Sequence, residues 1–118
     1  MMLPPVYATL MSDPVVASMT GGRIRQDVGN PDEGAPYIVW GLLSAVPEMT
    51  TQRRAPADRC SISVDVFARD EAEREALTAA ARHALEPHGH ILTIQSLGKD
   101  TETGLWRMTF DMDWFITR

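Results

Sequence analysis

The chain has 118 residues, which suits a single domain with one core, so we expect one domain over residues 1–118. Apolar residues make up 44% of the sequence and charged residues 23%, as in ordinary globular domains. The net charge of −5 gives no excess of positive charge that would attract phosphate, which argues against a nucleic-acid-binding module. It does not argue against a protein past which DNA moves without binding.

Cysteine content and hydropathy exclude two further classes. The single cysteine, Cys60, cannot form a disulfide within the chain, so nothing indicates a small secreted protein stabilised by disulfides. No apolar run approaches the roughly 20 residues that span a bilayer, and the first residues lack the basic segment of a signal peptide. We therefore expect synthesis in a reducing cytoplasm and no membrane partner.

Two short helices are expected at the N-terminus. The first covers LPPVYATLMSD, with prolines in its first turn and one apolar face made of Leu3, Val6, Tyr7 and Leu10. The second covers SDPVVASMTGG, where Asp13 can cap the helix, Pro14 suits its first position and Gly21 ends it.

A strand is expected from Pro36 to Val46, after a loop with a short strand around Ile24. Both faces of the longer strand are apolar, with Ile38, Trp40 and Leu42 on one face and Tyr37, Val39 and Leu43 on the other. We expect Pro47 to end this strand. The following residues, EMTTQRRAPAD at 48–58, are expected to form a long polar loop.

The segment from Arg59 to Ala68 alternates and predicts a strand whose inward side chains are Cys60, Ile62, Val64, Val66 and Ala68. Asp70 and Glu73 then begin a helix. Its expected packing face is a small-residue stripe of Ala72, Ala76, Ala80 and Ala84 with Leu77 and Leu85.

The C-terminal part predicts a hairpin. HILTIQSL is a strand, GKDTETG is a turn and the last strand runs from Trp106 to Ile116. The last strand turns six large apolar side chains one way: Trp106, Met108, Phe110, Met112, Trp114 and Ile116. The order of elements predicts an α+β fold, with a single mixed or antiparallel sheet and the main helix and N-terminal helices packed on one face.

Four blocks in this order resemble the tail-completion family of long-tailed bacteriophages, also called tail terminators or tail-to-head joining proteins, with related members in prophages and gene transfer agents. The blocks are PPVYATLMSDPVVASMTGGRI, APYIVWGLLSAVPE, DRCSISVDVFARDEAEREALTAAARHALE and DTETGLWRMTFDMDWF. The resemblance covers nearly the whole chain, and its specificity comes from a combination of features. These are a Pro-Tyr strand, a strand that leads directly into an acidic-capped helix, and the turn DTETGL before the final aromatic strand.

The resemblance implies a structural virion protein and no enzyme. Such proteins form a ring, usually of six subunits, on the head-proximal end of the tail tube. The ring ends tube polymerisation and meets the head-side connector or stopper, and DNA crosses its central channel without sequence-specific binding. The implied partners are further copies of the chain, the tail tube protein and the connector. Another neck component and a small ligand-binding or enzymatic domain of a bacterial cell remain as alternatives.

Candidate assembly residues follow from uncovered faces. Tyr37, Val39 and Leu43 lie on a strand face that no expected helix covers, which indicates a subunit contact unless the N-terminal segment folds over it. Asp65, Asp111 and Asp113 lie on outward strand faces. They could form an acidic channel wall that repels phosphate, or an ordinary solvated surface.

The basic pair Arg53 and Arg54 lies in the expected loop. These residues could meet acidic residues of a neighbouring subunit, such as Asp32 or Glu33, could line the channel, or could be solvated loop charges.

Chemical sites are not indicated. Asp111 and Asp113 would lie about 7 Å apart, but no cleft or raised pKa supports acid–base catalysis. His88 and His90, near His83, would project to one side of an extended segment, yet zinc needs a further ligand in fixed geometry. Cys60 is expected to be a buried, unreactive thiol. We therefore predict no catalytic residue, metal or cofactor.

Overall fold

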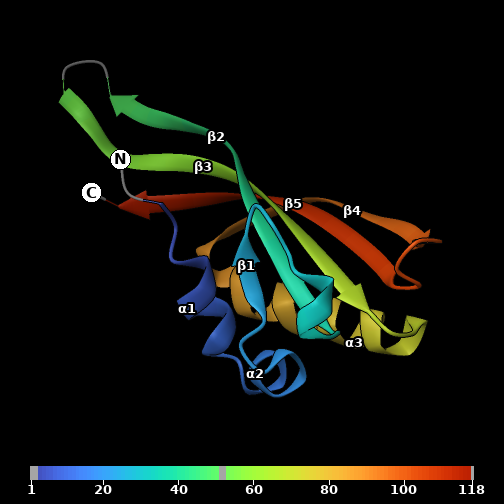
Figure 1. Ribbon diagram of the computed structural model, residues 1–118. Helices are drawn as coiled ribbons and strands as arrows, with labels where there is room; N and C mark the ends of the chain where they lie inside the picture. Colours follow the sequence, from blue (N-terminus) through green and yellow to red (C-terminus); the bar gives the residue numbers. More distant parts are fainter. Residues whose placement is uncertain (1–2, 51–52, 118) are drawn as a thin grey trace.

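The computed structural model describes residues 3–50 and 53–117. Its elements are α1 (Val6–Met11), α2 (Pro14–Thr20), β1 (Ile24–Gln26), the 3₁₀ turn η1 (Pro31–Glu33), β2 (Tyr37–Thr50), β3 (Arg53–Ala68), α3 (Glu71–Leu85), the 3₁₀ turn η2 (Glu86–His88), β4 (Gly89–Lys99) and β5 (Trp106–Thr117) (Figure 1). The strands form one sheet in the order β1-β2-β3-β5-β4. The β1 strand runs parallel to β2 and every other pair is antiparallel, so the predicted mixed α+β sheet is confirmed.

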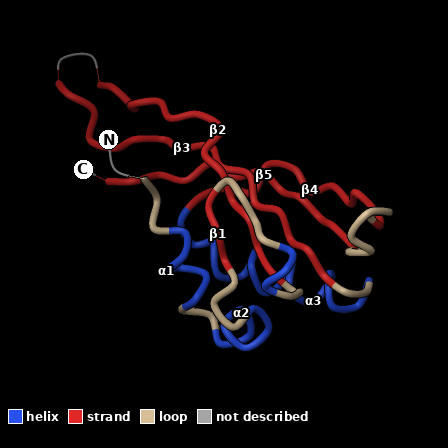
Figure 2. The backbone as a smooth tube through the Cα atoms, in the orientation of Figure 1, coloured by secondary structure: helices blue, strands red, loops and turns tan. Residues whose placement is uncertain are grey.

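The three α-helices lie on one side of the sheet (Figure 2). Within the described residues, no α-helix covers the second face, and no helix has the length and apolar character to cross a membrane. The hairpin of β2 and β3 extends beyond the helical layer, which gives the molecule a long axis of 52 Å (Figure 1).

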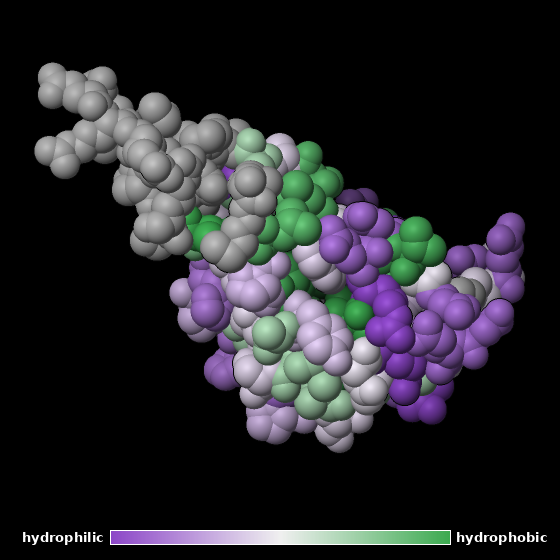
Figure 3. All heavy atoms as spheres, turned by 60° about the vertical axis from the view of Figure 1, so that its left-hand side comes forward, coloured by the Kyte–Doolittle hydropathy of each residue, from purple (hydrophilic) through white to green (hydrophobic). Residues whose placement is uncertain are grey.

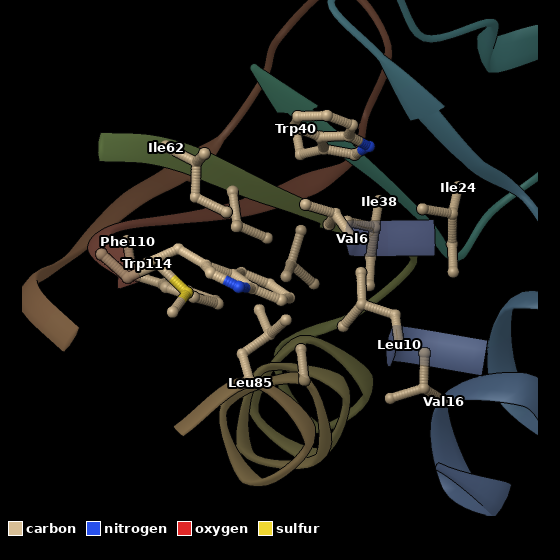
Figure 4. Packing of buried hydrophobic residues seen from close by; sticks show 14 of the residues in the cluster. Val6, Leu10, Val16, Ile24, Ile38, Trp40, Ile62, Leu85, Phe110 and Trp114 are labelled. Carbon is tan, nitrogen blue, oxygen red and sulfur yellow. The ribbon is translucent and has the colours of Figure 1, made fainter. Parts of the chain in front are cut away.

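The core fills the space between the sheet and the helices. Ile62, Phe110 and Trp114 point from the sheet toward Leu10 of α1 and Leu85 of α3 (Figure 4). The predicted alternation in β3 is confirmed, because its inward side chains from Cys60 to Ala68 are fully buried. The row on β5 is buried from Met108 to Trp114, while Trp106 and Ile116 at its two ends are partly exposed.

Helix ends follow the local sequence as expected. The Asp13 carboxylate accepts hydrogen bonds from the backbone N–H groups of Val15 and Val16, and Gly21 ends α2 in the left-handed conformation. The Asp70 carboxylate accepts from the N–H of Glu73 at 2.8 Å and so begins α3.

The buried side of two helices differs from the prediction. Val6 and Leu10 of α1 are buried, but Tyr7 of the same helix and Leu3, which precedes it, are 49% and 41% exposed. On α3, the buried residues are Arg74, Leu77, Thr78, Ala81 and Leu85. Ala72 and Ala76 are exposed, and Ala80 and Ala84 lie at the border of the contact. The alanine stripe therefore flanks the packing face, because the larger Leu77 and Leu85 bury more apolar surface than the alanines can.

The predicted loop at residues 48–58 is wrong for residues 48–50 and 53–58, which lie in β2 and β3, and residues 51–52 lie outside the described part of the chain. The antiparallel pairing continues through Pro47 opposite Asp58 and reaches Thr50 opposite Arg53. The β1 strand pairs with β2 only as far as Trp40, so β2 is an edge strand beyond that point. An edge strand tolerates proline, because the missing N–H lies on the side where no neighbour needs it.

Candidate assembly surface

The sheet face opposite the helices is called the open face below. It is formed by alternate residues of four strands, because neighbours across a ladder point to the same side. These residues are Tyr37, Val39, Gly41 and Ser44 of β2, Arg59, Ser61, Ser63, Asp65 and Phe67 of β3, Arg107, Thr109, Asp111, Asp113 and Phe115 of β5, and His90, Thr93, Gln95 and Gly98 of β4.

One end of the open face is aromatic and basic. The rings of Tyr37 and Phe67 stack with centroids 4.7 Å apart, and the Arg107 guanidinium lies 5.3 Å from the Phe67 ring centroid. Arg107 also donates to Asp65 at 3.2 Å. Burial raises the pKa of the Tyr37 hydroxyl, with Asp100 adding to the rise and Arg107 opposing it. The side chains at this end of the open face are therefore held in place by contacts with one another.

The sequence left open whether the face that carries Tyr37 meets another subunit or is covered within its own chain. Tyr37 is only 6% exposed. A Cβ placed on Gly29 would lie 3.0 Å from the Tyr37 ring and 2.6 Å from a Val39 methyl, so the backbone at Gly29 passes directly over these two side chains. The segment between β1 and β2 therefore covers this part of the open face, where the sequence had offered the N-terminal segment as the cover.

The three candidate acidic residues all lie on the open face. Asp113 accepts a hydrogen bond from the Ser61 hydroxyl at 2.6 Å, and Asp65 is paired with Arg107. Asp111 lies between Ser63 of β3 and Thr93 of β4 in the ladder. The structure thus brings Asp65, Asp111 and Asp113 together on one surface, where two of the three carboxylates have partners within the chain.

An open groove of about 250 Å³ crosses the open face where β1 ends. Its lining includes Val39, Gly41 and Leu43 of β2, Ser63 and Asp65 of β3, and Asp27 at the end of β1. Gly41 provides the depth, since a Cβ there would lie 3.1 Å from Asp27 Oδ1 and 3.8 Å from the Ser63 hydroxyl. The groove combines apolar walls with negative charge.

Asp27 holds its place at the end of β1 through the backbone. Its N–H donates to the carbonyl oxygen of Trp40 at 2.7 Å, which closes the last rung between β1 and β2. Its φ is +67°, a left-handed conformation that aspartate tolerates better than most residues. The chain then turns over the sheet, and β2 is left with a free edge from Gly41 onward.

Leu43 and the basic pair lie along the free part of β2 and β3. Leu43 is at a register shift between Leu42 and Ser44, which turns its side chain outward to 57% exposure. Arg53 and Arg54 begin β3 at the far end of the hairpin rather than in a loop. Their side chains lie outside the described part of the structure.

Figure 3 shows apolar residues gathered beside the grey atoms and hydrophilic residues at the opposite end of the same view.

A second set of exposed apolar residues, on β4, was not predicted from the sequence. Its members are Leu92, Ile94 and Leu97, which are 54%, 43% and 42% exposed. The β4 strand is the second edge of the sheet and carries two register shifts, which interrupt its ladder as bulges do in edge strands that avoid pairing.

The histidines do not form the one-sided pair that an extended segment predicts. His88 stacks on Trp114, whose side chain is in the core, whereas His90 meets the edge of Phe115 on the open face, with centroids 6.1 Å apart. They therefore lie on opposite faces of the sheet. The described residues contain no cluster of three His, Cys, Asp or Glu side chains that could hold a metal, and Cys60 is fully buried.

Comparison with known proteins gives a family and a fold. The family model described as "Tail completion protein gp17" matches residues 4–117. No curated protein matches the sequence. Among solved structures, a chain from the "Virion of native gene transfer agent (GTA) particle" is similar with a TM-score of 0.68 and 15% identity, covering 96% of this chain and 92% of that chain. The gp17 protein of bacteriophage SPP1 is similar with a TM-score of 0.51 and 18% identity, covering 89% of this chain and 84% of that one.

Proposed function

Because this chain belongs to the family of tail completion protein gp17, whose model matches residues 4–117, we propose that it forms a ring at the head-proximal end of a phage-type tail. The ring ends polymerisation of the tail tube and joins the tail to the head-side connector, and DNA crosses its central channel. The protein is a structural component of a virion and has no enzymatic role. The match over almost the whole chain is the observation that carries this proposal.

The surface of the monomer is consistent with a ring. A closed ring repeats one heterologous contact, in which two different surfaces of the same chain meet. The free edge of β2 and the exposed apolar side chains of β4 lie at opposite edges of the sheet and provide two such surfaces. Solvent-exposed apolar patches on small domains usually mark protein contacts.

The acidic residues of the open face fit passage of DNA. Asp65, Asp111 and Asp113 lie on one surface, and the whole chain has a net charge of −5. A channel wall of this sign repels phosphate, so DNA in transit does not bind to it. We propose that this surface faces the channel.

The test combines assembly with capping. Light scattering after size exclusion measures the mass of the purified protein at rising concentration, and negative-stain images reveal rings. Purified tail tubes incubated with the protein should stop elongating and carry extra density at one end. Tubes that elongate at the same rate with and without the protein, and carry no added density, would rule out the terminator role.

Co-purification separates this role from that of a head-side neck component. In particles disrupted into heads and tails, the proposal expects the protein in the tail fraction. Its recovery with capsids alone would favour a stopper on the head side of the junction.

A further inference from the structure

Two exposed charges of opposite sign lie at opposite edges of the sheet, and neither is paired with the residues that the structure describes. One is the carboxylate of Asp27, at the end of β1, and the other is the ammonium group of Lys99, at the end of β4. By contrast, ion pairs within the chain hold the guanidinium groups of Arg25, Arg69, Arg74, Arg82 and Arg107. A charge in solvent needs no partner, so the surroundings of these two decide what they indicate.

Each of the two charges lies beside exposed apolar side chains. Asp27 precedes Val28, which is 77% exposed, and it lines the groove together with Leu43. Lys99 follows Leu97, which lies at a register shift of β4 and is also exposed. We call Asp27, Val28 and Leu43 the Asp27 patch, and Leu97 and Lys99 the Lys99 patch. Exposed apolar side chains beside polar ones are typical of protein contacts, and here the two patches carry opposite charges.

The turn after β4 leaves Lys99 available for a carboxylate elsewhere. Asp100, its acidic neighbour, uses Oδ1 to accept a hydrogen bond from the N–H of Glu102 at 2.8 Å. The backbone of Asp100 is also bonded within the turn, since its N–H donates to the carbonyl oxygen of Leu105. These bonds stabilise the turn and engage Asp100 there rather than with Lys99.

Lys99 cannot reach Asp27 of its own chain. Three strands lie between β1 and β4, so about 19 Å separates these two strands at about 4.8 Å per step. This separation exceeds the length of a lysine side chain. Two complementary patches that cannot meet within one chain can meet between two copies of it.

We propose that in the assembled ring the Lys99 patch of one subunit docks on the Asp27 patch of the next. Lys99 pairs with Asp27, and Leu97 packs beside Leu43 at the groove. This inference rests on the proposed ring and names its contact. Because the two patches are different surfaces at opposite edges of one sheet, the contact is heterologous, and its repetition can close a ring.

Cross-linking tests which surfaces meet. A protein with Leu97→Cys is mixed with a protein with Leu43→Cys, and a short bis-maleimide is added, both in solution and on purified tail tubes. The native Cys60 is fully buried, so the engineered thiols are the reactive ones. We expect a covalent dimer from the mixture and none from either variant alone. The matched control replaces Leu97→Cys by Leu3→Cys, a leucine of similar exposure that precedes α1.

The outcomes of the cross-linking separate this contact from the proposed function. A dimer that forms with Leu97→Cys and not with Leu3→Cys supports the docking. The absence of a dimer overturns it, as does equal product with Leu3→Cys or cross-linking of Leu97→Cys to a different virion protein. Capping of tail tubes by the wild-type protein is measured independently. A protein that caps tubes without this cross-link therefore leaves the function standing and removes the inference.

A double-mutant cycle tests the ion pair itself. Asp27→Asn removes the carboxylate and keeps a side chain that tolerates positive φ, while Lys99→Gln removes the ammonium group. The measurement is the protein concentration at which light scattering shows half assembly. We expect each single change to raise this concentration about tenfold at low salt, and less at high salt. The double variant should lose no more than either single variant, because both remove the same contact.

Asp32→Asn is the matched charge control. It makes the same substitution at another exposed aspartate, in η1, and changes the net charge equally. We expect it to leave assembly unchanged, and thermal melts of all the variants show whether each is folded. Losses that add up in the double variant, or an equal loss from Asp32→Asn, would contradict a direct pair between Lys99 and Asp27.

Discussion

The imidazole of His88 stacks on the indole of Trp114, with ring centroids 5.0 Å apart and planes inclined by 15°. This contact joins the turn after α3 to the buried row of β5. Trp114 is 3% exposed, whereas Trp106 at the other end of the same row is partly exposed. The six apolar residues of the last strand are therefore not equivalent.

Replacement of Trp114 should be the more damaging of the two. We expect Trp114→Ala to lower the free energy of unfolding by about 3–5 kcal/mol, because it removes a buried indole and leaves a cavity. Trp106→Ala should cost clearly less, since part of that indole is already in solvent. Urea denaturation of both variants measures the difference. A loss below about 1 kcal/mol for Trp114→Ala would show that this row is not core.

Gly89 should not tolerate any side chain. A Cβ at this position would overlap the backbone carbonyl group of Asp113 on the paired strand. Backbone cannot move aside as a flexible side chain can, so we expect Gly89→Ala to cost at least about 1–3 kcal/mol through overpacking.

Gly41→Ala is the matched control for Gly89→Ala. Its Cβ would meet the end of the exposed Asp27 side chain at 3.1 Å, which can shift. We expect a change in the free energy of unfolding below about 1 kcal/mol. Similar melting temperatures for the two variants would contradict the steric account of Gly89.

The ion pair at the start of α3 should make stability depend on acid. Arg69 donates to both carboxylate oxygens of Glu73, at 3.1 and 2.5 Å, and this hydrogen bonding lowers the pKa of Glu73. A lowered folded-state pKa stabilises the fold above the ordinary glutamate pKa of about 4.3, and that contribution is lost as pH falls through the lowered value.

Glu73→Gln removes this contribution. We therefore expect wild type to be more stable than Glu73→Gln at pH 7, and the difference to shrink as pH is lowered below about 4. Thermal melts of both proteins from pH 7 to pH 3 provide the measurement. A difference that stays constant over this range would mean that the carboxylate has no linked effect.

The cap of α2 should also contribute measurably. The Asp13 carboxylate accepts from the N–H groups of Val15 and Val16 at 2.9 and 3.2 Å. Asp13→Ala leaves both donors without their side-chain acceptor, and we expect a loss of about 1 kcal/mol in the free energy of unfolding. Asp13→Ser, which can accept the same bonds, should recover most of the loss in the same denaturation experiment.

The candidate surface could be predicted only in part. Alternation along β3 and β5 correctly turns Asp65, Asp111 and Asp113 to the same face, because side-chain direction in a strand has a period of two. It could not reveal Asp27 or Gly41, whose role depends on where β1 stops beside β2. The group DVGN did carry a turn signal, since Asp, Gly and Asn favour positive φ, and Asp27 adopts it.

By itself the sequence determined the α+β class, the caps at Asp13 and Asp70 and the inward rows of β3 and β5, because each depends on neighbours within a few residues. Only the tertiary structure decided that pairing runs through Pro47, that Tyr37 is covered by the chain at Gly29 and that Ala72 and Ala76 lie outside the packing face of α3. These features depend on which strand lies alongside, and a missing neighbour at the edge of β2 is what makes Pro47 acceptable and the groove open.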